Sequence, residues 1–279
     1  MNLPPRSRPG ALRPSLRGVK RLAKRVVPVA LGLYFVPIAA AVAFGVGLLD
    51  FLRNRRRTLG SCDRYFFGNG VFTWLLAPFN LFVDVLCVPF RNRGIYKLAD
   101  LPQAYRDEIA ELIDAAHKSD LVGKLAEKFG DKKRGMMFFK WYGKNVDASV
   151  SVPEFHKRFK YIRTIGVSIF NAKQSTGKHF GPLRLTLRLL YNVNTVTSPN
   201  AFITVGNHTH RWCEEKLFIF DDTLQHQSCN DSDAVRYCLF VDILRPSYVP
   251  RVLDALLACV RGLVARFNRV FYKHWTFMK

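Results

Sequence analysis

The chain has 279 residues, enough for one large domain or two small ones, and 49% of them are hydrophobic, which supports a packed core and argues against wholesale disorder. It carries 43 Lys and Arg against 21 Asp and Glu, a net charge of +22, so an anionic partner is expected. The six cysteines show no CxxC pair or regular spacing, which argues against a disulfide framework or a zinc knuckle and favours reduced thiols in a cytoplasmic compartment.

The first 25 residues form a basic arm that carries eight Lys and Arg and no acidic residue. No hydrophobic periodicity runs through it, so we expect it to be disordered before it meets a partner. The arm ends where a long apolar run begins, an arrangement that an anionic membrane surface attracts. Because no sequence signature of a nucleic-acid-binding fold is present, the expected partner is anionic lipid and not nucleic acid.

Two apolar runs follow the arm. Val26–Leu49 has 24 residues without a charge, long enough to span a bilayer and too long for a secretory signal peptide. Val71–Phe90 is interrupted by Asn80 and Asp84, so it fits either a second span or a half-inserted, interfacial segment. We therefore predict that residues 26–90 form a membrane-anchoring region with one span and a second apolar segment, and the number of passes stays open.

From about residue 95 the pattern becomes that of a soluble domain. Apolar residues show helical spacing over 104–129. After about residue 136 short apolar runs alternate with Gly, Pro, Asn and Asp, which predicts strands and a mainly β sandwich or barrel, including the jelly-roll class. The predicted strands cover Val167–Phe170, Leu183–Leu190, Ala201–Val205, Lys216–Phe220 and Tyr237–Ile243.

The C-terminal segment, residues 248–279, has the pattern of an amphipathic basic helix. Its apolar residues from Leu253 to Phe271 fall on one face, and its basic residues lie mostly off that face. A helix packed on the domain and a helix lying on a membrane both fit this pattern, and the basic polar face slightly favours the membrane.

Seven histidines are present, and most of them fit structural roles. His208 and His210 follow Gly206–Asn207, a dipeptide typical of a hairpin turn, so metal binding is their less favoured role. His179 and His226 lie at the edges of two predicted strands and are 47 positions apart, enough for several strands of a barrel. They form the candidate metal-binding pair.

Two arginines stand inside apolar strand patterns. Arg236 begins the run that continues as Tyr237–Ile243, and Arg188 lies within Leu183–Leu190. A buried guanidinium needs a carboxylate partner, and two arginines that converge with two histidines would suit a metal together with a dicarboxylate. Surface arginines on an edge strand are the alternative interpretation.

Five blocks of sequence stand in one order along the chain: Phe138–Tyr142, Thr176–His179, Leu187–Arg188, Phe220–His226 and Val241–Pro246. Through these blocks, residues from about 135 to 247 resemble the aspartyl/asparaginyl β-hydroxylase family, most closely its bacterial, membrane-anchored lipid A 2-hydroxylase branch. The resemblance implies a double-stranded β-helix, the cupin-like jelly roll, as a catalytic domain over residues 95–247 with a leading helix and further flanking helices.

The resemblance also implies a set of site residues. His179 and His226 would hold Fe(II), with 2-oxoglutarate and O2 as cosubstrates. Arg236 and Ser168 would bind the distal carboxylate of 2-oxoglutarate, and Arg188 falls where the family places an arginine near the cosubstrate. The two histidines and Arg236 are therefore the expected catalytic residues.

Two positions depart from the expected pattern. Many oxygenases of this superfamily read His-x-Asp at the first site, but this chain has Gly181 there, so the carboxylate of the facial triad is missing. The animal aspartyl hydroxylases of the resembled family also have glycine at this place, and a water oriented by Asp221 or Asp222 could take the third position. Leu190 stands where the family tends to have a histidine, which alters the expected cosubstrate contacts.

The resulting prediction is an Fe(II)- and 2-oxoglutarate-dependent dioxygenase that hydroxylates an acyl chain of an anionic membrane lipid, specifically C2 of a secondary acyl chain of lipid A. The expected location is the bacterial inner membrane, with the catalytic domain facing the cytoplasm and without an obligate protein partner. Hydroxylation of Asp or Asn in a protein is the alternative among enzymes. A catalytically dead, membrane-bound interaction module is the alternative of another class, because the carboxylate ligand is missing.

Overall fold

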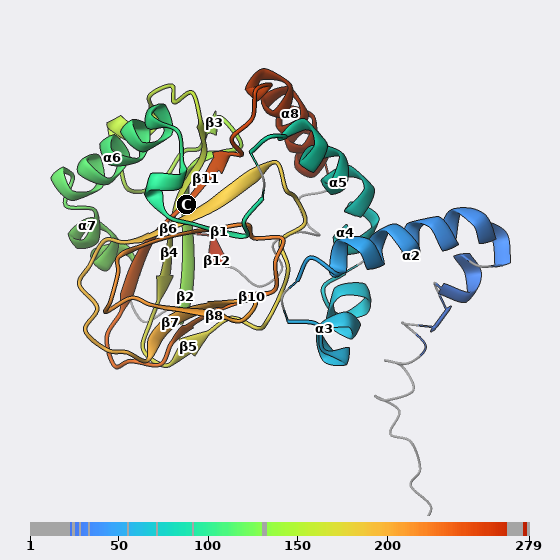
Figure 1. The fold of residues 1–279 in the computed structure, drawn as a ribbon. Coiled ribbons are helices and arrows are strands. Elements are labelled where there is room, and N and C mark those ends of the chain that lie inside the picture. The colour runs from blue at the N-terminus through green and yellow to red at the C-terminus, as the bar shows by residue number, and fades with distance from the viewer. Residues whose placement is uncertain are drawn as a thin grey trace, which may run out of the picture.

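The structure is a computed structural model, and it describes residues 23, 26–27, 29–32, 34–54, 56–70, 72–90, 92–129, 133–266 and 276–277 (Figure 1). Apart from residue 23, the basic arm predicted over residues 1–25 lies outside this part of the chain. The described residues form a group of N-terminal helices, a two-layered β structure and a C-terminal helix that lies beside the N-terminal group (Figure 1).

Two sheets form the β structure. The larger has the order β1-β9-β6-β11-β4-β2-β12, with β3 paired to β2, and the smaller has the order β5-β10-β7-β8. All pairs are antiparallel except β12 with β2. The strands are β1 Ile95–Tyr96, β2 Arg134–Trp141, β3 Lys144–Asn145, β4 Ile162–Phe170, β5 Gln174–Ser175, β6 Thr186–Asn192, β7 Ala201–Val205, β8 His208–Arg211, β9 Leu217–Phe220, β10 His226–Asn230, β11 Arg236–Leu244 and β12 Thr276–Phe277.

The path of the chain between the sheets defines the fold class. From β4 to β11 successive strands alternate between the larger and the smaller sheet, except at the β7–β8 hairpin, which stays within the smaller sheet. Two antiparallel sheets filled in this alternating order have the topology of a jelly roll. The predicted mainly β, jelly-roll-like fold is confirmed, and so is the hairpin at Gly206–Asn207, where Gly206 has a φ of 58°.

The two faces of the larger sheet are covered differently. Its inner face shares an apolar core with the smaller sheet, which includes Leu190, Ile203, Phe218 and Cys238. Its outer face packs against α6 (Gln103–Lys118) and α7 (Leu121–Phe129) in a second core. The single helical stretch predicted over 104–129 is thus two helices, because the chain turns at Asp120, whose φ is 46°. Short 3-10 turns lie at η2 Leu98–Asp100 and η3 Pro153–His156.

The N-terminal helices do not match the predicted span. Val26–Leu49 is not one helix, because Val36 leaves helical geometry and α2 (Pro37–Phe51) starts at the following proline, which restricts the residue before it. In the described part of the chain no single helix is long and apolar enough to cross a membrane. Leu59–Gly68 and Phe72–Leu86 meet the length and hydropathy criteria only as a pair, and they are bent by 92°. This pair comprises α3 Leu59–Asp63, the π-helix η1 Arg64–Gly68, α4 Phe72–Leu75 and α5 Ala77–Leu86.

The C-terminal helix α8 runs over Pro250–Arg266 and is shorter than predicted. Residues 267–275 lie outside the described chain, and Thr276–Phe277 is strand β12, so the prediction of one helix over 248–279 is wrong at its end. Leu253 and Leu257 of α8 pack in one apolar cluster with Val83, Cys87 and Leu244, so α8 covers α5 and the C-terminal end of β11.

Candidate active site

His179 and His226 are brought together by the main chain. Each donates its backbone N–H to the carbonyl of the other, at N···O distances of 3.0 and 2.9 Å, which makes an isolated antiparallel bridge. Residues directly opposite each other in such a bridge project to the same side. Their imidazole centroids are accordingly 4.2 Å apart. The two histidines are 47 positions apart in the sequence, but the backbone bridge places them in one site.

The hydrogen bonds of the imidazoles select their tautomers. Nδ1 of His179 lies 2.8 Å from the carbonyl oxygen of Gly177, and Nδ1 of His226 lies 2.9 Å from that of Leu224. A carbonyl only accepts, so each Nδ1 carries the hydrogen and each Nε2 keeps a free lone pair. Burial lowers the pKa of both rings, and His179 lowers that of His226 further. Neutral rings with free Nε2 atoms are in the state that binds a metal.

Gly181 and Asp222 account for the absence of a carboxylate side chain at the position two residues after His179. Within the described residues, no group of three or more His, Cys, Asp or Glu side chains is placed to hold a metal. A Cβ at position 181 would overlap the Asp222 carboxylate. Gly181 also donates its N–H to the carbonyl of Asp222 at 2.7 Å, which fixes this close approach. The space that a His-x-Asp side chain would need is therefore filled by a carboxylate from the loop before His226.

Arg188 finds its carboxylate partners within the chain. Its Nε donates to Asp242 at 2.7 Å, its Nη2 lies 3.0 Å from Asp222, and its guanidinium carbon lies 3.8 Å from the centre of the Phe240 ring. Burial opposes the charge of Arg188, but the two carboxylates outweigh it and raise its pKa. Burial also raises the pKa of Asp222 to about 7, although Arg188 lowers it. Arg188 thus holds Asp222 in place beside Gly181.

Arg236 contrasts with Arg188. Its side chain is 1% exposed, and its Nη2 donates to Ser228 Oγ at 2.7 Å. Its guanidinium carbon lies 4.7 Å from the ring centre of Phe170 and 5.2 Å from that of Trp212. Among the described residues, its Nε and Nη1 have no hydrogen-bond partner. Burial lowers the pKa of Arg236, and no carboxylate offsets that effect. Such a guanidinium is costly unless a ligand supplies the missing acceptor.

Ser168 lies on the same inner face as Arg236. It stands opposite Cys238 in the β4–β11 register, two residues along β11 from Arg236. It is buried, and its Oγ donates to the carbonyl of Cys238 at 3.4 Å. His208 and His210 lie elsewhere, on β8, where Nε2 of His210 hydrogen bonds to the Glu215 carbonyl at 2.9 Å.

The N-terminal helices hold both segments that carry the histidines. Asn69 accepts the N–H of Phe180 at 3.0 Å and donates to its carbonyl at 2.7 Å. Gln225 donates its N–H to Asn54 at 3.1 Å and accepts from Ser61 at 3.0 Å. Phe180 and Gln225 are the immediate neighbours of the two histidines. The region predicted as an anchor is therefore part of the wall of this site.

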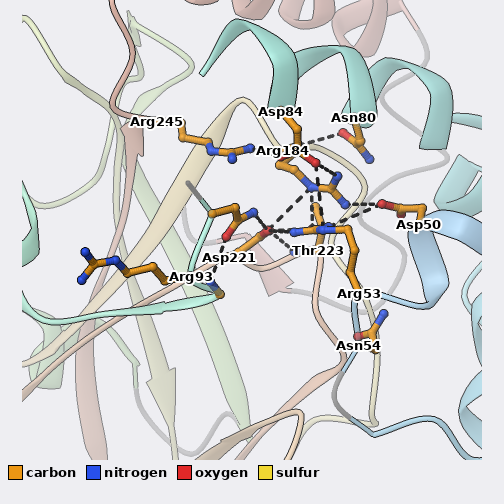
Figure 2. Close-up of polar contacts among 12 residues, drawn as sticks. Asp50, Arg53, Asn54, Asn80, Asp84, Arg93, Arg184, Asp221, Thr223 and Arg245 are labelled. Carbon is orange, nitrogen blue, oxygen red and sulfur yellow. Dashed lines mark hydrogen bonds and ion pairs between the residues drawn. The ribbon is translucent and has the colours of Figure 1, made fainter. Parts of the chain in front are cut away.

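A buried charge cluster joins these helices to the β structure (Figure 2). The Arg184 guanidinium pairs with Asp50, lies 2.6 Å from Asp84, and lies 3.6 Å from Asp221. Arg53 lies 2.8 Å from Asp221. Arg184 and Asp221 are completely buried. With Arg245, which lies 2.5 Å from Asp84, these residues make up the buried charge cluster.

Asp221 belongs to this cluster and not to the space beside Gly181. Burial opposes its ionisation, but Arg53 and hydrogen bonds from Thr223 and Asn92 outweigh burial and keep its pKa below the usual value. Of the two adjacent carboxylates considered from the sequence, Asp222 is the one that reaches the Gly181 position.

Several residues of this arrangement were not singled out from the sequence. Asp50, Arg184 and Arg245 had no assigned role, and Asp84 was treated as a polar interruption of an apolar run. The signal was present, because a carboxylate such as Asp84 inside an apolar run must face a partner. Asn80, the second interruption, accepts the N–H of Arg184 at 2.9 Å and so faces the β structure as well (Figure 2).

Comparison with known proteins adds a family match and partial relatives. A family model described as aspartyl/asparaginyl beta-hydroxylase matches residues 102–246. An ornithine lipid ester-linked acyl 2-hydroxylase from Rhizobium tropici is 36% identical over 91 residues, which are 32% of this chain and 32% of that protein. The aspartyl/asparaginyl beta-hydroxylase of Mus musculus is 29% identical over 94 residues, which are 34% of this chain and 13% of that protein. The match thus spans about a third of the first relative and less of the second.

Among solved structures, an oxidoreductase from Burkholderia pseudomallei, described as a member of the 2OG-Fe(II) oxygenase family, aligns with 34% of this chain and 48% of its own. The sequence identity is 13% and the TM-score is 0.27. A score this low does not establish a shared fold.

Proposed function

The chain belongs to the aspartyl/asparaginyl β-hydroxylase family, and we propose that it is an Fe(II)- and 2-oxoglutarate-dependent dioxygenase that hydroxylates an acyl chain of an anionic membrane lipid. The observation that carries the proposal is the combination of two neutral histidines with free Nε2 atoms and a buried arginine that lacks a carboxylate among the described residues. The first suits a divalent metal and the second suits a dicarboxylate.

His179 and His226 would hold the iron through Nε2. When bound, Fe(II) with 2-oxoglutarate supplies the oxidising chemistry that places one oxygen atom of O2 into a C–H bond. The backbone bridge keeps the two imidazoles in place, and the Nδ1 hydrogen bonds keep the binding tautomer. Asp222, held by Arg188 and fitted against Gly181, would orient a water at the position where other oxygenases have a carboxylate ligand.

Arg236 would bind the distal carboxylate of 2-oxoglutarate through one edge of its guanidinium, formed by Nη2 together with either Nε or Nη1. Ser228 fixes the guanidinium through one of the two Nη2 hydrogens, and Ser168 adds a hydroxyl on the same inner face. The Phe170 and Trp212 rings against the guanidinium exclude water and so strengthen the charge pair. Arg188 would act on the cosubstrate end of the site through Asp222, because its guanidinium already has two carboxylate partners.

A lipid substrate is supported by the surface of the helices. All the large hydrophobic side chains that the structure shows exposed lie within residues 26–88 or 248–263, on the helical side of the molecule. On α5 they include Phe82 at 52% and Val85 at 68%, and α8 follows Tyr248 at 74%. Together with the net charge of +22, this surface suits an anionic bilayer. Asn54, Ser61 and Asn69 of the same N-terminal region contact the histidine segments, so the site would face the lipid.

The specific substrate we propose is lipid A, hydroxylated at C2 of a secondary acyl chain, at the bacterial inner membrane with the β structure facing the cytoplasm. The Rhizobium tropici relative is described as acting on an ester-linked acyl chain of ornithine lipid, which supports the 2-hydroxylation of an acyl chain. Mass spectrometry of lipid A and of total phospholipid and aminolipid, from cells with and without the chain, tests the proposal. A gain of one oxygen atom on an acyl chain is expected, and lipids of unchanged mass would overturn it.

Hydroxylation of Asp or Asn in a protein is the second candidate, favoured by the description of the Mus musculus relative. The two candidates separate in vitro, because release of succinate from 2-oxoglutarate would depend on added lipid in one case and on added peptide in the other. A third candidate, a catalytically dead module, predicts that Arg236→Ala leaves 2-oxoglutarate binding unchanged. The dioxygenase proposal predicts a loss of about 2–5 kcal/mol, with only partial rescue by Arg236→Lys.

A further inference from the structure

Unpartnered buried polar atoms gather at one place in the jelly roll. In the described part of the chain, eight buried side-chain nitrogen and oxygen atoms lack a hydrogen-bond partner. Five of them belong to three residues: Nδ2 and Oδ1 of Asn192, Nε1 of Trp212, and Nε and Nη1 of Arg236. Exposure is 0% for Asn192, 2% for Trp212 and 1% for Arg236, so solvent does not satisfy these atoms from outside.

The strand register brings the three residues together. Asn192 ends β6 and stands opposite Cys238 of β11, which in turn stands opposite Ser168 of β4. Directly paired residues share a face, so Asn192 points to the inner face, as Cys238 does within the apolar core between the sheets. Arg236 is two residues along β11 and therefore on that face too, and the Trp212 ring lies 5.2 Å from its guanidinium carbon.

We infer that Asn192 and Trp212 are specificity-determining residues that complete, with Arg236, a donor cradle for the distal carboxylate of the dicarboxylate cosubstrate. The inference rests on the proposed function for the identity of that cosubstrate. Nothing in the family resemblance assigned a role to either residue. Leu190, two residues before Asn192 on the same face, offers no hydrogen bond where the family tends to have a histidine.

The chemistry of the orphaned atoms favours a carboxylate. Four of the five are donors: two N–H groups of Arg236, the amide N–H of Asn192 and the indole N–H of Trp212. A carboxylate accepts about four hydrogen bonds on its two oxygens, so it can accept from one edge of the guanidinium, from the amide and from the indole, and it neutralises the charge of Arg236. A cation would face the guanidinium charge, and an apolar group would leave the donors unsatisfied. The cradle thus adds two neutral donors to the single charged one.

The test uses the full-length protein loaded with Mn(II) in place of Fe(II), with isothermal titration of 2-oxoglutarate, and tryptophan fluorescence as a second readout. Asn192→Leu keeps the size of the side chain and removes both orphaned atoms. We expect it to weaken 2-oxoglutarate binding at least tenfold, the loss typical of a hydrogen bond to a charged group. Asn192→Asp replaces a donor by a negative charge and should weaken binding further. Trp212→Phe removes only the indole N–H and should weaken binding by threefold or more.

The stability of the ligand-free variants separates a binding role from a structural one. An unsatisfied buried amide is destabilising, so Asn192→Leu should leave the thermal midpoint unchanged or raise it by about 2–4 °C. The matched control is Asn194→Leu, because the Asn194 amide donates to Val235 at 2.8 Å and accepts from Tyr237 at 2.9 Å. It should lower the midpoint and leave 2-oxoglutarate affinity unchanged.

The experiments distinguish a failure of the proposed function from a failure of the cradle alone. If the wild-type protein binds 2-oxoglutarate no better than the monocarboxylate 2-oxobutyrate, the proposed function itself fails. If the wild type binds 2-oxoglutarate and Arg236→Ala abolishes binding, while Asn192→Leu and Trp212→Phe bind as the wild type does, the cradle is refuted and the proposed function stands. A lower thermal midpoint for Asn192→Leu with unchanged affinity would make Asn192 a structural residue and would also refute the cradle.

Discussion

The carboxylate of Asp222 occupies the space that the side chain of any larger residue at position 181 would need, and Gly181 donates its backbone N–H to the carbonyl of the same aspartate at 2.7 Å. The two residues are 41 positions apart in the sequence, yet each explains the other. The glycine is required because the carboxylate is there, and the carboxylate can lie against position 181 because the glycine has no Cβ.

This relationship predicts a double-mutant cycle. Gly181→Ala should lower the free energy of unfolding by about 1–3 kcal/mol, because the new methyl group overlaps the Asp222 carboxylate. In the Asp222→Ala background the same substitution should cost much less, since the space is then open. Urea denaturation of the four proteins measures both effects. Equal costs in the two backgrounds would show that the overlap is relieved in some other way.

Asp222 also predicts a pH dependence of stability. Burial raises the pKa of its carboxyl to about 7, above the value of about 3.9 for an unfolded chain. The contribution of the protonated group to stability is therefore complete below about pH 4 and is lost as the pH rises through about 7. Relative to Asp222→Asn, the wild-type unfolding free energy should fall by roughly 2–3 kcal/mol between about pH 5 and pH 8. If the unfolding free energies of the two proteins change with pH in the same way, the raised pKa of Asp222 is contradicted.

The histidine pair predicts metal binding. His179→Ala and His226→Ala should each weaken Fe(II) or Mn(II) binding by more than about 100-fold, because loss of an outer-shell partner alone costs about 10–100-fold. His208→Ala is the control, since His208 is exposed on β8, its ring stacks against Phe218, and the β7 strand separates it from His226 in the sheet. Metal titration by calorimetry measures the three variants. Equal affinity in all of them would remove the proposed metal site.

The ion pairs of Arg184 with Asp50 and Asp84 predict that the N-terminal helices and the β structure unfold as one unit. Arg184→Ala would remove one of the partners of Asp50 and of Asp84 from the buried charge cluster, and breaking a buried charge pair costs about 3–5 kcal/mol. The substitution should also weaken metal binding, because the Asn69 and Gln225 contacts depend on the same packing. A calorimetric unfolding scan and a metal titration check the two effects. An unaltered unfolding temperature would show that the two parts are independent.

The exposed apolar surface predicts lipid binding. Replacing Phe82 and Val85 together by serine should reduce sedimentation with vesicles that contain anionic phospholipid, because both side chains are exposed and would lose apolar contact with the bilayer. Binding of 2-oxoglutarate should be unchanged, since neither residue lies in the β structure. Vesicles of neutral phosphatidylcholine should bind the wild type more weakly, given the net charge of +22. If the double variant sediments with the vesicles as much as the wild type does, this surface does not bind the lipid.

The strands could be predicted from the sequence because their buried residues alternate with exposed ones or form continuous apolar runs. Ala201–Val205 was predicted with the bounds that the structure has, and the run at Tyr237–Ile243 was one residue short at each end. Leu183–Leu190 was placed too early, because Arg184 belongs to the loop before β6 and serves the buried charge cluster. Apolar patterning cannot distinguish a strand residue from a buried loop residue of the same chain.

The candidate site could be predicted from the sequence only in part. His179, His226 and Arg236 could be proposed as site residues from their positions and from the family resemblance, but the backbone bridge between the histidines joins residues that are distant in sequence. The partners of Asp84 could not be named from the sequence, because a carboxylate in an apolar run has the same pattern whichever cation it faces. Only the tertiary structure shows that it meets Arg184 and Arg245.

The buried charge cluster also limits which N-terminal helices can be combined with this β structure in one chain. The helical side contributes Asp50, Asp84 and Arg53, and the other side contributes Arg184, Arg245 and Asp221, so each side has a surplus of one charge that the other neutralises (Figure 2). A chimaera that took its first 90 residues from a distant relative would keep neutrality only if the relative carried the same signs at the same places. The family match begins at residue 102 and so does not include these helices, although they carry three of the six charges of the cluster.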